Sequence, residues 1–279
     1  MKLARYGEVG HERPAIVDAD GALRCVAAYV DDWTGATLAR AAELRDLDIV
    51  GLPRVDPTAR LGPCVGGVGK FICIGLNYAD HAAETGAEVP SEPVIFAKAT
   101  SAICGPDDPV IRPRNSTKLD WEVELGVIIG QAARYVTPEE AQDCIAGYCV
   151  VNDVSERAFQ LERGGTWDKG KGCDSFGPIG PWLVTRDEMP DVGDLHMWLA
   201  VNGRRFQDGS TRTMVFKPDF LVSYVSQFMS LQPGDVISTG TPPGVGMGQK
   251  PPLYLQPGDV IELGIAGLGT QRQSVIAES

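Results

Sequence analysis

Short apolar runs, separated by glycine and proline clusters, fill the chain from Lys70 onward. They are FICIGL, PVIFAK, VELGVIIG, IAGYCVVNDV, PWLV, LHMWLAVNG and GDVISTG. Runs of this length between turn residues are typical of β-strands. Helix-like stretches are few and lie near residues 78–84, 138–143, 155–162 and 218–228. The pattern predicts a β-rich α+β fold with peripheral helices, in which the sheet is rolled or barrel-like rather than doubly wound.

The first 65 residues predict a small N-terminal domain. LARYG and PAIVDADGALRCV read as short strands, and a helical stretch near GATLARAAELRDL follows them. The glycine- and proline-rich LPRVDPTARLGPCVGGVGK is typical of a linker. We therefore divide the chain into a small N-terminal domain over residues 1–65 and a larger domain over residues 66–279, which is long enough for a sizeable core.

Charge and cysteine usage exclude several classes of protein. The chain has 25 basic and 37 acidic residues, a net charge of −12, which argues against nonspecific binding to nucleic acid or anionic membranes. Its seven cysteines are scattered without a C-x-x-C motif, as expected for reduced thiols in a cytoplasmic protein. The sequence shows neither a signal-peptide core nor a membrane-spanning apolar run, so we expect a cytoplasmic protein that acts on a small molecule.

One segment occurs twice. LQPGDVISTG begins at Leu231 and LQPGDVIELG at Leu255, and each is a Pro-Gly-Asp turn that leads into a strand. We expect the two copies to begin two similar hairpins of one rolled sheet. The first copy continues into TGTPPGVGMG, a flexible polar loop suited to close approach by a ligand.

Acidic residues interrupt two of the predicted strands. In LDWEVELGVIIG, alternation places Glu122 and Glu124 on one strand face with Asp120, about 7 Å apart, where they should repel. Asp153 ends a neighbouring apolar run. Three oxygen ligands suit Mg²⁺ or Mn²⁺, and a shared cation would remove the repulsion. Spacing alone leaves two alternatives open, a solvated sheet face for the glutamates and a helix cap formed by Asp153 with Glu156.

Three further residues suggest acid–base and anion chemistry. His81 and Glu84 in GLNYADHAAETG are three residues apart, so one helical turn would let the carboxylate orient the imidazole as a base for water. An exposed helix face is the alternative. Lys171, in the glycine-rich RGGTWDKGKGCDSFGPIGP, could hold an anion or a developing oxyanion, or could belong to a solvated loop. Lys98 follows an apolar strand and lies either at its exposed end or in a site.

These residues fall within six ordered segments that together resemble the fumarylacetoacetate hydrolase family. The segments are GLNYADHAAE, FAKATSA, DWEVELGVIIG, VNDVSERAFQ, KGKGCDSFGPIGPW and ISTGTPPGVG, and the resemblance covers roughly residues 70–269. It implies a rolled mixed β-sheet catalytic domain, or β-roll, behind a small N-terminal domain, assembled as a homodimer. It also implies Mg²⁺ or Mn²⁺ held by Glu122, Glu124 and Asp153.

The resemblance further implies roles for other residues. His81 with Glu84 would activate water, and Lys171 would stabilise the oxyanion. The segment over residues 81–93 would be a lid. The substrate contacts implied by family position are Lys98, Arg157, Gln160 and Thr241, although Arg157 could instead be a structural ion-pair partner.

The implied reaction is metal-dependent cleavage of the C–C bond of a 2,4-diketo acid to pyruvate and a carboxylic acid. Within the family, the chain looks most similar to hydrolases of 2,4-diketo-3-deoxy sugar acids such as L-rhamnonate or L-fuconate derivatives, and simpler acylpyruvates fit the same chemistry. The alternatives are oxaloacetate decarboxylation, hydration or isomerisation of a 2-keto-enoate, and ureidoglycolate lyase activity. A non-catalytic cation-binding module is the alternative from another class.

Overall fold

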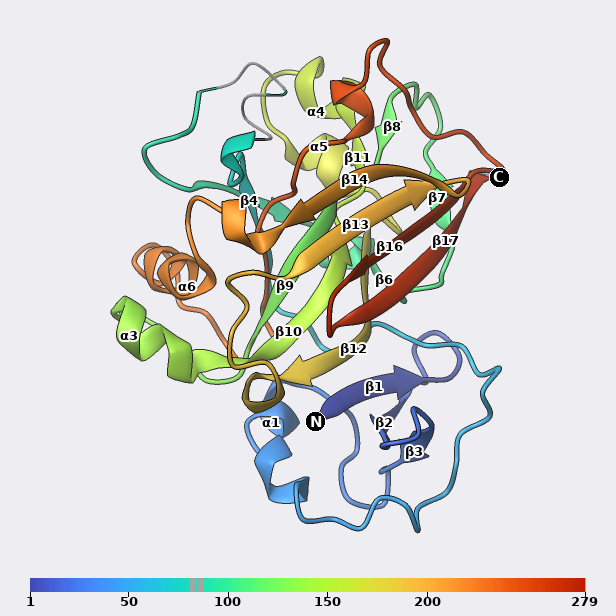
Figure 1. Ribbon diagram of the computed structural model, residues 1–279, viewed down its shortest axis with the longest axis vertical. Helices are drawn as coiled ribbons and strands as arrows, with labels where there is room; N and C mark the ends of the chain where they lie inside the picture. Colours follow the sequence, from blue (N-terminus) through green and yellow to red (C-terminus); the bar gives the residue numbers. More distant parts are fainter. Residues whose placement is uncertain (81–83, 85–87, 279) are drawn as a thin grey trace.

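Most of the fold consists of three open sheets in the computed structural model, which describes residues 1–80, 84 and 88–278 (Figure 1). The largest sheet has ten strands, in the spatial order β3 (Leu23–Cys25), β2 (Arg13–Val17), β1 (Lys2–Tyr6), β12 (Gly177–Thr185), β10 (Ile145–Asn152), β9 (Val123–Ile129), β15 (Val236–Ser238), β4 (Phe71–Gly75) and β5 (Val94–Lys98), with β6 (Ile103–Cys104) paired to β12. The sheet is mixed, because β15 is parallel to β4 and antiparallel to β9. The predicted strand-rich α+β fold is confirmed, and no sheet closes into a barrel within the described residues.

A second sheet covers one face of the first. Its five strands are β14 (Arg204–Ser210), β13 (His196–Val201), β16 (Val260–Ile265), β17 (Gly269–Ala277) and β7 (Val110–Arg112), and it lies across β9 and β10 in Figure 1. The main hydrophobic core lies between these sheets, where Val123, Leu125 and Val127 of β9 join Leu199 and Leu263 in one buried cluster. Alternate residues of β9 therefore face away from this core. A two-stranded sheet, β8 (Leu119–Asp120) with β11 (Ser155–Glu156), lies beyond the start of β9.

The helices are short and lie at the periphery. They are α1 (Gly35–Leu38), α3 (Pro138–Ala141), α4 (Arg157–Leu161), α5 (Asp168–Lys171) and α6 (Pro218–Ser226), with 3₁₀ turns η1 (Ala41–Leu44), η2 (Thr100–Ala102), η3 (Gln142–Cys144), η4 (Arg186–Glu188), η5 (Thr211–Thr213) and η6 (Gly246–Gly248). The helix predicted near 138–143 is confirmed, and Thr137 and Glu140 form its capping box. The helix predicted from residue 155 starts two residues later, because residues 155 and 156 pair with β8.

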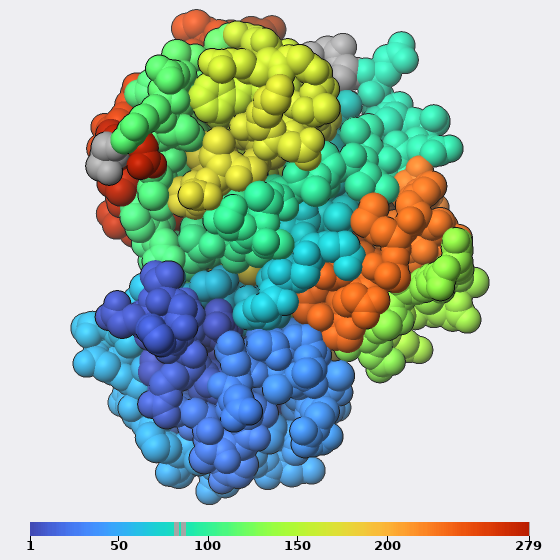
Figure 2. Space-filling view, turned by 180° about the vertical axis from the view of Figure 1, so that it is seen from behind, coloured from blue at the N-terminus to red at the C-terminus, as the bar shows by residue number. Residues whose placement is uncertain are grey.

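The N-terminal residues form a lobe against the rest of the molecule (Figure 2). The lobe is nevertheless joined to the larger part by β1, which pairs with β12 and extends the main sheet. A second buried cluster includes Leu3, Ile16 and Trp33 from the lobe together with Phe71 and Ile128 from the main sheet. The lobe therefore shares its core with the larger part, and the domain boundary after residue 65 stays a prediction.

The two Pro-Gly-Asp turns have the same local structure but lead into different sheets. Asp235 accepts a hydrogen bond from the backbone N–H of Gln232 at 2.7 Å, and Asp259 accepts the equivalent bond from Gln256 at 2.7 Å. The turn glycines have φ values of 89° and 99°. The strand after the first turn is β15, between β9 and β4, whereas the strand after the second is β16, which forms a hairpin with β17. The prediction of two equivalent hairpins in one sheet is therefore wrong for the first copy.

Two expectations from composition can be compared with the structure. All seven cysteines are free thiols, as predicted. Among the described residues, no helix has both the length and the apolar character that a membrane span requires.

Replacing Trp33 tests whether the lobe folds together with the main sheet. Its side chain is fully buried in the shared cluster, and its Nε1–H donates to the Ala15 carbonyl at 3.0 Å. We expect Trp33→Ala to lower the free energy of unfolding by about 3–5 kcal/mol. We also expect thermal unfolding, followed by calorimetry, to remain a single transition. The exposed Val50→Ala should change stability by less than about 0.5 kcal/mol. A separate low-temperature transition in Trp33→Ala would show that the lobe is an independent domain.

Candidate functional site

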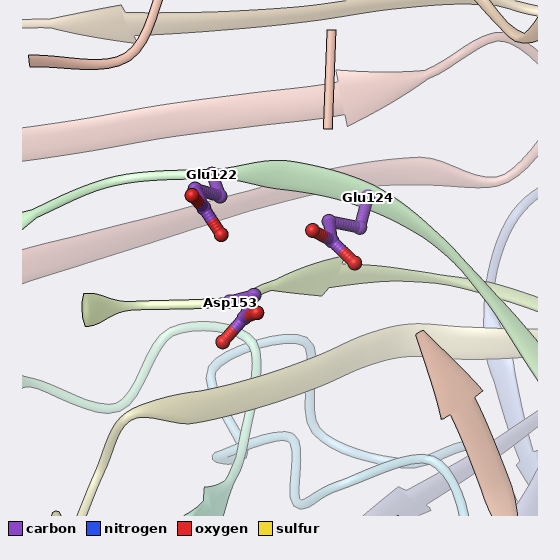
Figure 3. A group of neighbouring side chains, drawn as sticks. All are labelled: Glu122, Glu124 and Asp153. Carbon is purple, nitrogen blue, oxygen red and sulfur yellow. The ribbon is translucent and has the colours of Figure 1, made fainter. Parts of the chain in front are cut away.

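Three carboxylates from neighbouring strands lie together on the face of the main sheet that points away from the main core. Glu122 and Glu124 alternate with the core residues Val123 and Leu125 along the β9 segment. Asp153 directly follows β10, and its backbone N–H donates to the Glu122 carbonyl at 2.9 Å. One oxygen from each carboxylate lies within 4.8 Å of the others, and Figure 3 shows the three side chains turned toward the same space.

Burial decides between the alternatives for these acids. Glu122, Glu124 and Asp153 are 5%, 2% and 0% exposed, so the solvated sheet face is wrong. The helix-cap alternative for Asp153 is also wrong. The N-cap of α4 is Glu156, whose carboxylate accepts a hydrogen bond from the Ala158 N–H at 3.0 Å.

Three buried cations hold two of the carboxylates. Lys171 Nζ donates to Glu122 Oε2 at 2.7 Å and to Asp153 Oδ2 at 2.8 Å. Arg157 Nη2 donates to Glu122 Oε1 at 2.6 Å, and Lys98 Nζ donates to Asp153 Oδ1. Burial acts to lower the pKa of Lys171 and of Arg157, but the neighbouring carboxylates outweigh it and raise both above their usual values. Both side chains are therefore positively charged at neutral pH.

The close packing of two short helices places Lys171 in this network. A Cβ at Gly170 would lie 2.5 Å from the Glu156 carbonyl oxygen and 2.5 Å from the Gln160 nitrogen. Only glycine therefore lets α5 approach α4 this closely, which brings the next residue, Lys171, over the acids.

Glu124 has a different environment from the other two acids. Its Oε2 accepts hydrogen bonds from Ser238 Oγ at 2.6 Å and from the Gly240 N–H at 2.8 Å. Burial, followed by the charges of Asp153 and Glu122, raises the pKa of Glu124 well above its ordinary value. A divalent cation among the three carboxylates would favour the ionised form of Glu124 and meet only hard oxygen donors. The donor set therefore fits Mg²⁺ or Mn²⁺.

Asp120 links this network to the glycine-rich loop over residues 241–248. Its carboxylate accepts hydrogen bonds from the backbone N–H groups of Gly246 at 2.6 Å and Met247 at 3.0 Å. It also accepts from Arg157 Nε at 2.8 Å, and Arg157 in turn holds Glu122. Strand alternation predicted Asp120 on the same face as the glutamates, but nothing in the sequence indicated its role.

Of the two residues predicted to activate water, His81 and Glu84, the structure describes only Glu84. The Glu84 carboxylate accepts the backbone N–H of Gly244 at 3.0 and 3.1 Å, so it lies against the same loop. His81, together with residues 82, 83 and 85–87 of the predicted lid, lies outside the described residues. The pairing of His81 with Glu84 therefore stays a prediction.

A cavity of about 150 Å³ opens over the acids. It is lined by Ile74, Gly75, Leu76, Phe96, Glu122, Glu124, Asp153, Arg157, Gln160, Leu161, Trp167, Lys171, Gly240, Thr241 and Met247. Of the predicted substrate contacts, Arg157, Gln160 and Thr241 line it. Lys98 lies behind Asp153 and also donates to the Val154 carbonyl at 3.0 Å. The apolar part of the lining was not predicted, because Phe96 and Trp167 lie in sequence patterns typical of an ordinary strand and an ordinary loop.

Buried carboxylate oxygens, neighbouring cations and a small cavity define a class of enzyme-like sites that could hold a divalent cation. Residues 70–276 match the family model described as fumarylacetoacetate (FAA) hydrolase C-terminal. The chain belongs to the fumarylacetoacetate hydrolase family, as the six sequence segments predicted.

Individual members of the family are similar to this protein over 98–100% of its chain. A protein of Burkholderia multivorans, provisionally named a hydrolase, is 61% identical over 276 residues and covers 98% of both chains. The structure of a fumarylacetoacetate hydrolase from Exiguobacterium antarcticum is similar with a TM-score of 0.90 and 39% identity, over 100% of both chains. The structure of maleylpyruvate hydrolase from Sphingobium sp. SYK-6, in complex with manganese(II) ion and pyruvate, is similar with a TM-score of 0.84 and 29% identity, again over 100% of both chains.

The raised pKa of Glu124 predicts a pH-dependent stability. The folded protein favours the neutral carboxyl of Glu124. The stability of the metal-free protein should therefore fall as the pH rises from about 4.5, the ordinary pKa of a glutamate, toward the raised pKa of Glu124. Glu124→Gln removes this titration and keeps an acceptor for Ser238. At pH 7 we expect the melting temperature of the metal-free variant to exceed that of the metal-free wild type, by roughly 2–4 °C for each kcal/mol gained in free energy of unfolding. This difference in melting temperature should shrink as the pH is lowered toward 5.

The measurement is thermal unfolding in chelator between pH 5 and pH 8. The exposed Glu8→Gln serves as a control and should melt with the wild type at every pH. Addition of Mn²⁺ should raise the melting temperature of the wild type but not that of Glu124→Gln. A variant that melts at or below wild type throughout this range would contradict the prediction.

Proposed function

We propose that this protein is a Mg²⁺- or Mn²⁺-dependent hydrolase that cleaves the C–C bond of a 2,4-diketo acid, either an acylpyruvate or a 2,4-diketo-3-deoxy sugar acid. The products are pyruvate and a carboxylic acid. The observation that carries the proposal is the buried oxygen cluster of Glu122, Glu124 and Asp153 at the floor of a cavity that Lys171 also lines. A similar structure that contains manganese and pyruvate supports it. The homodimer implied by the family resemblance stays part of this proposal.

The charges around the cavity suit a substrate with one carboxylate. The acids Asp120, Glu122, Glu124 and Asp153 face three cations, Lys98, Arg157 and Lys171, which leaves a formal charge of −1. A bound divalent cation would change this to +1, which attracts a monoanionic 2-keto acid. When bound, the ion supplies Lewis-acid stabilisation of negative charge on the 2-keto oxygen.

Lys171 is the residue best placed to stabilise charge on the reacting carbonyl. Its ammonium group lies 2.7 Å from Glu122 and 2.8 Å from Asp153 and also lines the cavity. Because its pKa is raised, the group is protonated and can bind the oxyanion that forms at C4 when water attacks. Arg157 forms ion pairs with Asp120 and Glu122 and also lines the cavity. Its main role would be to orient Glu122 as a metal ligand, while its side chain also lies next to the substrate.

His81 would remove a proton from the attacking water. Glu84, which would orient the imidazole, is held at Gly244 of the loop that also contributes Thr241 and Met247 to the cavity. Hydroxide adds to C4, the C3–C4 bond breaks, and its electron pair forms the enolate of pyruvate. A proton added at C3 completes pyruvate, and the acyl half leaves as a carboxylic acid.

Pyruvate release from a substrate panel tests the proposal. The panel contains acylpyruvates, a 2,4-diketo-3-deoxy sugar acid, oxaloacetate and a 2-keto-enoate, each assayed with Mg²⁺, with Mn²⁺ and with chelator. We expect metal-dependent release from a diketo acid. We also expect Glu122→Ala to lower the rate of pyruvate release by more than the roughly 10–100-fold that is typical when a residue that only hydrogen-bonds to a metal ligand is lost. The exposed Glu8→Ala should leave the rate unchanged. Pyruvate release from oxaloacetate alone would identify a decarboxylase. Consumption of the enoate alone, followed by loss of its ultraviolet absorbance because hydration and isomerisation release no pyruvate, would identify a hydratase or isomerase.

Replacing His81 separates hydrolysis from simple binding. We expect His81→Ala to lower kcat for the diketo acid by roughly 10²–10⁴-fold, the usual contribution of a positioned base. Mn²⁺ affinity, measured by calorimetric titration, should be unchanged. His196→Ala is the matched control, because His196 bonds Asp208 at the surface. Full activity in His81→Ala would remove the water-activation role.

A further inference from the structure

The cavity changes character from its floor to its mouth. At the floor, Glu124 and Asp153 are almost fully buried, whereas at the mouth Leu161 is 52% exposed. Two half-buried aromatic rings, Phe96 and Trp167, also line the cavity, with centroids 5.2 Å apart and edge-to-face geometry. The Phe96 ring also lies 5.1 Å from Lys171 Nζ, so the aromatic wall begins directly beside the charged cluster.

The apolar wall is held in place by its surroundings. A Cβ at Gly75 of β4 would lie 2.6 Å from the Trp167 ring, so the absence of a side chain at Gly75 leaves the space that the indole fills. On another side of the cavity, the backbone of Met247 is held by Asp120 at 3.0 Å. These contacts give the acyl end of the cavity a defined apolar shape.

The polar groups of the described lining are already engaged. Lys171 and Arg157, its cations, each bind two carboxylates of the cluster. Thr241 Oγ1 donates to the Val123 carbonyl at 2.9 Å and accepts from Gln207 at 2.8 Å. The Gln160 amide oxygen accepts from Arg157 Nη1 at 3.1 Å. A second carboxylate on the substrate would therefore lose water without gaining a further cation, and sugar hydroxyls would find few free polar partners in the described lining.

We propose that the acyl group of the substrate is uncharged and apolar, a short aliphatic chain or a phenyl ring that packs over Phe96 and Trp167 and ends at Leu161. The whole cavity has about 150 Å³, a volume comparable to one that accepts benzene, and it must also hold the keto-acid end of the substrate, so the acyl group is compact. This inference rests on the proposed function and narrows it to acylpyruvates with an apolar tail, in preference to diketo sugar acids and diketo dicarboxylates.

The test compares substrates that differ only at the tail. Pentanoylpyruvate and glutarylpyruvate have the same acyl chain length, but the second ends in a carboxylate. We expect kcat/KM of the Mg²⁺-loaded wild type to favour pentanoylpyruvate by about 10- to 100-fold over glutarylpyruvate and over a 2,4-diketo-3-deoxy sugar acid. As a second measurement, pentanoate should inhibit competitively at lower concentration than glutarate.

Leu161→Arg supplies a cation at the mouth of the cavity. It should raise kcat/KM for glutarylpyruvate by about 3-fold and lower it for pentanoylpyruvate. Val50→Arg, an exposed residue of the N-terminal lobe, should change neither. If the wild type prefers glutarylpyruvate or the sugar acid, the inference is overturned while the proposed function stands. If no diketo acid releases pyruvate, the proposed function itself fails and the inference with it.

Discussion

The structure around the site depends on the mutual neutralisation of charges buried against one face of the main sheet. Asp120, Glu122, Glu124 and Asp153 lie almost out of contact with water, where like charges repel strongly and each charge has lost its hydration. Three buried cations, Lys98, Arg157 and Lys171, offset this cost through direct hydrogen bonds. One negative charge more than positive charge remains, and burial together with the nearby carboxylates raises the pKa of Glu124. A further cation would stabilise the ionised form of Glu124, so the network favours its addition.

The same network organises the elements that carry it. Glu122 directly precedes β9 and Glu124 lies in it, Asp153 follows β10, and Lys98 ends β5 at the edge of the sheet. Arg157 and Lys171 come from α4 and α5, which have only five and four residues. Ion pairs to the acids, together with the close approach at Gly170, fix these two helices over the sheet. Removing one cation should therefore disturb the position of a helix as well as the charge of the site.

Local sequence predicts what depends on local geometry. Strand alternation correctly separated Glu122 and Glu124 from the core residues of β9, and turn chemistry correctly identified both Pro-Gly-Asp turns. It could not tell that the turns lead into different sheets, because strand partners are chosen by distant segments. The late start of α4 has the same cause, a pairing with β8 more than thirty residues earlier. Burial of the acids was equally invisible, since spacing alone does not show what covers a sheet face.

The position of the cations connects catalysis with substrate choice. The two cations that line the cavity, Lys171 and Arg157, each bind two of the buried carboxylates. Neither is therefore free to pair with a negative charge at the far end of a substrate. Recognition of that end then depends on shape and apolar contact. Trp167 is the N-cap of α5 and Lys171 is its last residue. One short helix therefore positions both the side chain that we propose packs on the acyl group and the ammonium that we propose stabilises the oxyanion. A substrate tail that fits against Trp167 should therefore hold Lys171 at the reacting carbonyl, which couples tail binding to kcat as well as to KM.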